Sequence, residues 1–127
     1  MITKALISPK SIVVVGGSDD VHKPGGATLR NLISTNFQGE LYVVNPKCDT
    51  VQGIKSYREI SDLPSVDCAI LAIPAKLCLA AVETLCNQKA CKGIIILSAG
   101  FGEDSKEGGI IEKKIVEICN STGTGLI

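Results

Sequence analysis

Two pairs of glycines bracket a polar loop near the start of the chain. Gly16 and Gly17 directly follow a run of β-branched residues, and Gly25 and Gly26 open a segment whose apolar residues have helical spacing. A glycine turn between a strand and a helix lets the backbone approach a pyrophosphate, which the N-terminus of the helix attracts. The loop departs from Gly-x-Gly-x-x-Gly, because its spacing is longer and Ser18 stands where the second glycine is expected. We predict a phosphate site here, with a tight turn that binds nothing as the alternative. The residues expected to form the site are Gly16, Gly17, Ser18, Lys23 and Gly25.

A lysine follows the second predicted strand, where an NAD-binding domain would carry an acidic residue. The sequence there is Asn45, Pro46, Lys47, and all three residues are predicted to contact the ligand. An ammonium cannot accept a hydrogen bond from ribose hydroxyls, but it can pair with a phosphate. The ligand is therefore expected to carry an extra phosphate on or near its ribose, as coenzyme A and NADP do. An ordinary solvated lysine is the alternative.

Two further loops follow predicted strands. One is an apolar corner whose proline provides a flat surface for an adenine ring, unless the proline only ends the strand. The other is rich in small residues and free amides, which suits a pantetheine arm or a phosphate, unless it is only a flexible turn. These positions are Ile73, Pro74 and Ala75 in the first loop and Ser98, Ala99 and Gly100 in the second.

The sequence offers no catalytic or metal-binding constellation. His22, the one histidine, lies in a polar loop where we expect solvation or a modest phosphate contact. Charged residues at 103, 104, 106 and 107 are expected to form a solvated helix start, and no Ser/His/Asp or Cys/His arrangement is visible. The six cysteines have no Cys-x-x-Cys spacing and lie mostly in apolar patterns, so we expect reduced, packed thiols and no metal site.

The elements that position these loops alternate between strand and helix. Apolar runs predict strands over residues 11–15, 41–44, 67–73, 93–97 and 124–127. Helical spacing predicts helices over 25–36, 75–90 and 110–120. In the last of these helices, Val116 is among the residues expected to face the core. A short helix or arm is expected over 2–9, a loop over 47–54 and a short helix over 56–60. The pattern predicts an α/β fold, a Rossmann-like doubly wound parallel sheet of about five strands with helices on both faces. In such sheets ligands bind outside the carboxyl ends of the strands.

Composition restricts the class of partner. The 127 residues suit one domain, and 45% hydrophobic with 3% aromatic residues predict an aliphatic core. Because 13 basic residues balance 13 acidic ones, no net field draws the chain to nucleic acid or to a membrane surface. No apolar stretch approaches the roughly 20 residues of a membrane span. The first ten residues lack a secretory signal, so we expect a cytoplasmic location.

Taken together, the four loops resemble the N-terminal coenzyme A-binding domain of NDP-forming acyl-CoA synthetases, the group that includes the α subunit of succinyl-CoA synthetase. The markers are residues 8–18, 44–47, 73–75 and 96–101. The resemblance implies that Gly16, Gly17 and Ser18 cradle phosphates of coenzyme A. It implies that Lys47 meets a phosphate of the ADP moiety, that residues 73–75 flank the adenine or ribose, and that residues 98–100 lie nearer the pantetheine.

The resemblance also implies that residues 1–127 form the N-terminal part of a longer, ADP-forming acid-thiol ligase. In the family, acyl transfer passes through a phosphorylated histidine on a later domain, a position that His22 does not match, so this chain is not expected to catalyse alone. The implied partners are coenzyme A or acyl-CoA and the remaining synthetase domains or an ATP-grasp subunit. Asp19 and Asp20 depart from a phosphate-binding loop and would weaken binding unless they face solvent.

Two other interpretations remain open from the residues. One is a stand-alone nucleotide-binding or redox-sensing regulatory module. The other is an NADP-linked oxidoreductase, which the sequence supports less because no Tyr-x-x-x-Lys pair is present.

Overall fold

Seven strands, four helices and one 3-10 turn lie within residues 3–97 and 106–127, which are the residues that the computed structural model describes. The strands are β1 (Ser11–Val15), β2 (Glu40–Val44), β3 (Thr50–Val51), β4 (Ile54–Tyr57), β5 (Cys68–Leu71), β6 (Gly93–Ile96) and β7 (Gly125–Leu126). The helices are α1 (Lys4–Ile7), α2 (Pro24–Ser34), α3 (Ala75–Gln88) and α4 (Lys106–Thr122), with a 3-10 turn, η1 (Ile60–Asp62). Within this part of the chain, none of the helices is long and apolar enough to cross a membrane.

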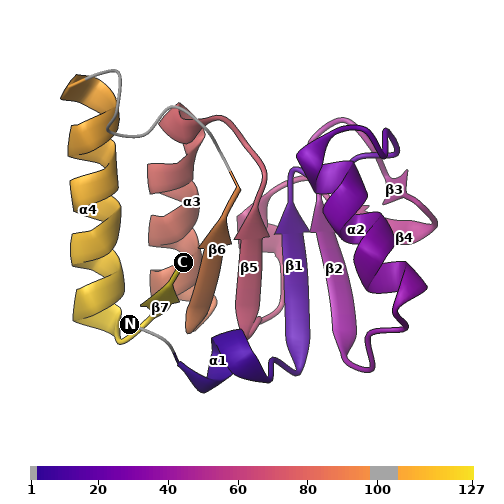
Figure 1. Cartoon of the computed structure of the whole chain (residues 1–127), viewed down its shortest axis with the longest axis horizontal. Helices are drawn as coiled ribbons and strands as arrows, with labels where there is room; N and C mark the ends of the chain where they lie inside the picture. The colour runs from indigo at the N-terminus through magenta and orange to yellow at the C-terminus, as the bar shows by residue number, and fades with distance from the viewer. Residues whose placement is uncertain (1–2, 98–105) are drawn as a thin grey trace.

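The strands form one sheet with β1 near its centre, in the order β3-β4-β2-β1-β5-β6-β7 (Figure 1). Neighbouring strands pair in parallel, except for the antiparallel pair of β3 and β4. In β1, Val14 lies opposite Val43 of β2 and Ile70 of β5. Because β1 is flanked by strands and covered on both faces, its continuous run of β-branched residues is fully buried, as parallel strands require.

Helices cover both faces of the sheet (Figure 1). On one face, Leu85 of α3 and Ile115 of α4 pack in a core that includes Leu71 of β5. On the other, Leu29 of α2 packs with Val14 of β1. All five side chains are buried almost completely. This arrangement confirms the predicted doubly wound α/β fold.

The predicted loop over 47–54 and short helix over 56–60 are wrong. A hairpin of β3 and β4 occupies this stretch, and β4 extends the sheet by pairing in parallel with β2. The sequence gives little sign of this hairpin, because β3 has only two residues. The connection is Gln52-Gly53, which is not one of the common Asn-Gly or Asp-Gly turns. Both residues have positive φ, 49° and 80°, as a two-residue type I′ turn requires.

The last helix begins at Lys106, earlier than the predicted start at residue 110. Gly108 and Gly109 lie outside the predicted helix, and glycine lowers helix stability by about 1 kcal/mol relative to alanine. Tertiary packing outweighs that cost, since Gly108 is buried in the first turn. Val116, which helical spacing placed in the core, is 39% exposed.

Thiol reactivity tests the core. Cys48 is partly exposed, whereas the other five cysteines are buried: Cys68, Cys78, Cys86, Cys91 and Cys119. Burial raises the pKa of the Cys68 thiol to about 11 and that of Cys91 to about 12. At about pH 8 we expect one thiol, that of Cys48, to react rapidly with Ellman's reagent in the native protein, and all six in urea. Rapid reaction of several thiols without denaturant would contradict this packing.

Candidate functional site

Three of the four predicted loops meet at the carboxyl edge of the sheet, because β2, β1 and β5 are neighbours and run in parallel. The loop after β1 leads into α2, the loop after β2 leads into the hairpin, and the loop after β5 leads into α3. Ser98, Ala99 and Gly100, predicted for the fourth loop, lie outside the described residues.

The glycines of the first loop allow the protein's own backbone to pack closely. Gly16 has a φ of 91°, and a Cβ there would meet the carbonyl of Ala72 after β5. A Cβ on Gly25 would meet the carbonyl of Gly16, so the start of α2 lies directly against the end of β1. A Cβ on Gly17 would lie 2.7 Å from Val43. Internal packing therefore accounts for these glycines, which the sequence analysis had attributed to contact with a phosphate.

Several backbone N–H groups at this corner have no acceptor among the described residues. The N–H of Gly16 is occupied, because it donates to the carbonyl of Val44 at 2.9 Å. The helix N-terminus adds donors, since the first N–H groups of a helix lack intrahelical partners. Unpaired N–H groups at a helix N-terminus attract anions. The unpaired groups belong to Gly17, Ser18, Gly25 and Gly26.

Asn45 connects the first loop to the second. Its Nδ2 donates to the Gly17 carbonyl at 3.0 Å, and its Oδ1 accepts the N–H of Lys47 at 2.9 Å. The Asn45 side chain is thus committed to holding the two loops together. The side chain of Lys47 is exposed, and no ion pair involves it among residues 3–97 and 106–127.

Arg58, which the sequence analysis did not single out, also supports the second loop. Its guanidinium donates to the carbonyl of Pro46 and to Asp49, both at 2.8 Å. The only signal in the sequence was its position directly after β4, a strand that was not predicted.

The acidic residues of the first loop have partners of their own. The Asp19 carboxylate accepts the N–H of Gln52 at 2.7 Å, and the Asp20 carboxylate accepts the N–H of His22 at 3.0 Å. Both aspartates are exposed, as is His22. Lys23, at the N-cap position of α2, is exposed as well.

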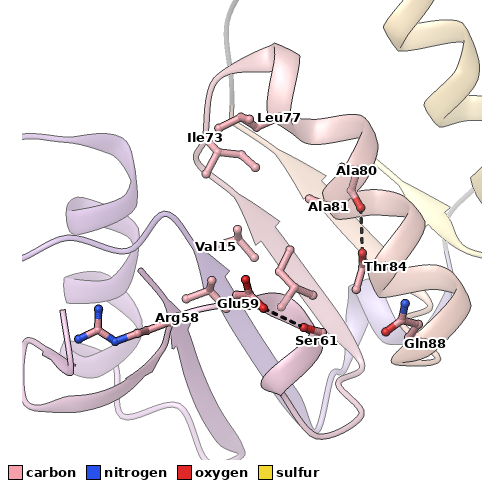
Figure 2. A pocket seen from close by; sticks show the side chains of 12 residues that line it. Val15, Arg58, Glu59, Ser61, Ile73, Leu77, Ala80, Ala81, Thr84 and Gln88 are labelled. Carbon is pink, nitrogen blue, oxygen red and sulfur yellow. Dashed lines mark hydrogen bonds between the residues drawn. The ribbon is translucent and has the colours of Figure 1, made fainter. Parts of the chain in front are cut away.

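A groove of about 640 Å³ begins beside the third loop and runs along the α3 side of the sheet (Figure 2). Ile73 and Leu77 lie at one end of it, while Thr84 and Gln88 line it farther along α3. Pro74 holds the N-cap position of α3 and Ala75 begins the helix. The floor is apolar, with Val15 and Val44 from the ends of two strands among the lining residues. Among the described residues, no cluster of histidine, cysteine and acidic side chains is able to hold a metal ion.

This strand order and these loops define a Rossmann-like nucleotide-binding domain. The sequence signature described as CoA binding domain matches residues 10–127, and the chain belongs to that family.

Relatives agree with this assignment. Acetate-CoA ligase (ADP-forming) II from Archaeoglobus fulgidus is 41% identical over 119 residues, which cover 93% of this chain and 18% of that protein. The alpha subunit of acetate-CoA ligase (ADP-forming) II from Pyrococcus furiosus is 39% identical over 124 residues, 94% of this chain and 26% of that subunit. The apo structure of dinucleotide forming acetyl-coenzyme A synthetase 1 from Ca. Korarchaeum cryptofilum has a TM-score of 0.87 and 33% identity, covering 98% of this chain and 27% of that one.

The chain is therefore a coenzyme A-binding domain of the kind found in ADP-forming acyl-CoA synthetases, which confirms the fold and the family that the sequence indicated. It spans 18% to 27% of the length of these relatives.

Proposed function

We propose that this chain binds the nucleotide end of coenzyme A across the carboxyl ends of β2, β1 and β5. One observation carries the proposal. The N–H groups of Gly17 and Ser18 have no acceptor among the described residues, and Asn45 links their loop to that of Lys47. A diphosphate would supply acceptors for these amides, and a further phosphate on the ribose would pair with the ammonium.

Each part of the ligand has a proposed set of contacts. The amides of Gly17, Ser18 and Gly25 donate to the diphosphate, and Gly16 acts by allowing the turn. Lys23 provides a second cation near the helix N-terminus. The adenine lies against Ile73, Pro74 and Ala75 and has room in the adjacent groove of about 640 Å³. Ser98, Ala99 and Gly100 are proposed to contact the pantetheine.

The residues after β2 have two different roles. Lys47 is proposed to contact the 3′-phosphate directly. Asn45 and Pro46 shape its loop, because the Asn45 amide and the Pro46 carbonyl already bond to protein groups. The sequence by itself predicts a direct ligand contact for all three residues.

The whole protein is proposed to be an ADP-forming acyl-CoA synthetase in which this domain holds the thiol substrate. Such an enzyme joins an acid to coenzyme A while ATP is cleaved to ADP and phosphate, or runs in reverse to make ATP. We propose that remaining synthetase domains or an ATP-grasp subunit, in the cytoplasm, supply the phosphoryl and acyl chemistry. Neither nucleic acid nor a membrane is a proposed partner.

Calorimetric titration of the chain with coenzyme A, dephospho-coenzyme A, NADPH and NADH tests the ligand. We expect coenzyme A to bind about tenfold more tightly than its dephospho form, because one charge-assisted hydrogen bond is worth roughly 1.5–3 kcal/mol and exposure places it at the low end. Tight binding of NADH with no response to coenzyme A would instead indicate a redox-sensing module. Preference for NADPH over coenzyme A would indicate an oxidoreductase.

A further inference from the structure

The tip of the β3–β4 hairpin contacts the loop of residues 18–26 through Gln52. Its Nε2 donates to the carbonyl of Ser18 at 2.8 Å and to that of Gly26 at 2.9 Å. Its backbone N–H donates to the carboxylate of Asp19 at 2.7 Å. A single side-chain amide thus joins the beginning of the loop to the first turn of α2.

The hairpin holds Gln52 in place. Val51, the preceding residue, is fully buried in the core on the α2 side of the sheet. Gln52 itself is half-buried, with a φ of 49° in the tight turn. Both hydrogens of its NH₂ group are used, so the side chain has no unmet donor.

Because the peptide is planar, a carbonyl that is held in place fixes the orientation of the next N–H group in the loop. In a trans peptide the C=O of one residue points opposite to the N–H of the next. Asn45, by holding the Gly17 carbonyl, orients the N–H of Ser18. Gln52, by holding the Ser18 carbonyl, orients the N–H of Asp19 in the same way.

Gln52 also binds the carboxylate of Asp19, which carries a negative charge inside the loop. A carboxylate close to a bound diphosphate would repel it. The Asp19 carboxylate is held by the N–H of Gln52 at the hairpin. Its charge is therefore turned toward the hairpin and partly compensated by that donor.

We propose that Gln52 is a positioning residue for the diphosphate of coenzyme A. It holds the loop of residues 18–26 in the shape that presents its amides, and it keeps Asp19 from the anion. This inference rests on the proposed function, since it requires that the loop bind phosphates.

The test compares variants of the full chain by calorimetry. Gln52→Gly removes both carbonyl contacts and suits a residue with positive φ, so the turn itself is not strained. Gln52→Met keeps the length of the side chain without its donors. Thr50→Ala is the matched control, because Thr50 is exposed on the same hairpin. We expect Gln52→Gly and Gln52→Met to weaken binding of coenzyme A about tenfold, and Thr50→Ala to leave it unchanged.

A second ligand separates positioning from general damage to the domain. Adenosine 3′-phosphate lacks the diphosphate, so its binding, followed by NMR shifts, is expected to be equal in wild type and Gln52→Gly. Equal loss for both ligands would overturn the positioning role, as would coenzyme A binding within twofold of wild type in both Gln52 variants. Failure of the wild-type chain to bind coenzyme A would overturn the proposed function as well, and that result is distinguishable because it needs no variant.

Discussion

Replacing Gly25 by alanine is expected to lower the free energy of unfolding by about 3 kcal/mol, the upper part of the range for overpacking a core. The added Cβ would meet the carbonyl oxygen of Gly16 and lie 2.8 Å from its carbonyl carbon. Both are backbone atoms at the end of a buried central strand, so no side chain is able to rotate away. Urea denaturation followed by far-ultraviolet circular dichroism measures the effect.

Gly53→Ala is the matched control for this substitution. A Cβ there has nothing within 4 Å, so the φ of 80° is the main source of strain. We expect a loss of about 1 kcal/mol, the usual cost of a left-handed conformation for an L-residue. Equal losses in the two variants would contradict the close approach of α2 to β1.

Lys47→Glu, which reverses the charge, is expected to weaken coenzyme A binding about a hundredfold, and Lys47→Ala is expected to weaken it about tenfold. The alanine variant removes one charge-assisted contact with a phosphate, whereas the glutamate variant adds repulsion. Because the Lys47 side chain is exposed, both variants are expected to unfold at the wild-type urea concentration. Calorimetric titration with coenzyme A and dephospho-coenzyme A measures the two affinities.

Lys10→Glu makes the same change of charge at the opposite edge of the sheet, where Lys10 precedes β1. It is expected to change the affinity less than twofold, because exposed charges separated by more than about 10 Å are largely screened at 0.1 M salt. If Lys47→Glu weakened the binding of coenzyme A and of dephospho-coenzyme A equally, Lys47 would be assigned to the diphosphate and not to the 3′-phosphate. No weakening at all would leave Lys47 as a solvated side chain.

The sequence by itself determined five of the seven strands described, the layers, and the edge of the sheet that carries the loops. Residues 12–15 form a continuous β-branched run, and such a run is stable as a strand only when both of its faces are covered. Parallel strands need a crossover for each connection, so their carboxyl ends all meet at one edge. The glycine corner, Lys47 and the Ile73-Pro74-Ala75 corner were therefore expected on one edge, and the structure has them there.

Only the tertiary structure decided what these residues do within the edge. The glycines at 16 and 25 face backbone carbonyls from other elements, and Asn45 bonds across to Gly17. A one-dimensional pattern shows that a residue is small or polar. It does not show which neighbour comes within hydrogen-bonding distance.

Gln52 shows most clearly why a contact between distant residues does not follow from the sequence pattern. It is 34 residues from Ser18 and 26 from Gly26, and it lies in a turn after a strand of two residues, which is too short to show a periodic pattern. Its contacts exist because β4 pairs with β2 and β2 pairs with β1, which brings the hairpin beside the loop of residues 18–26. Local propensity determines where strands begin and end, but the order of strands is decided by the packing of the whole sheet.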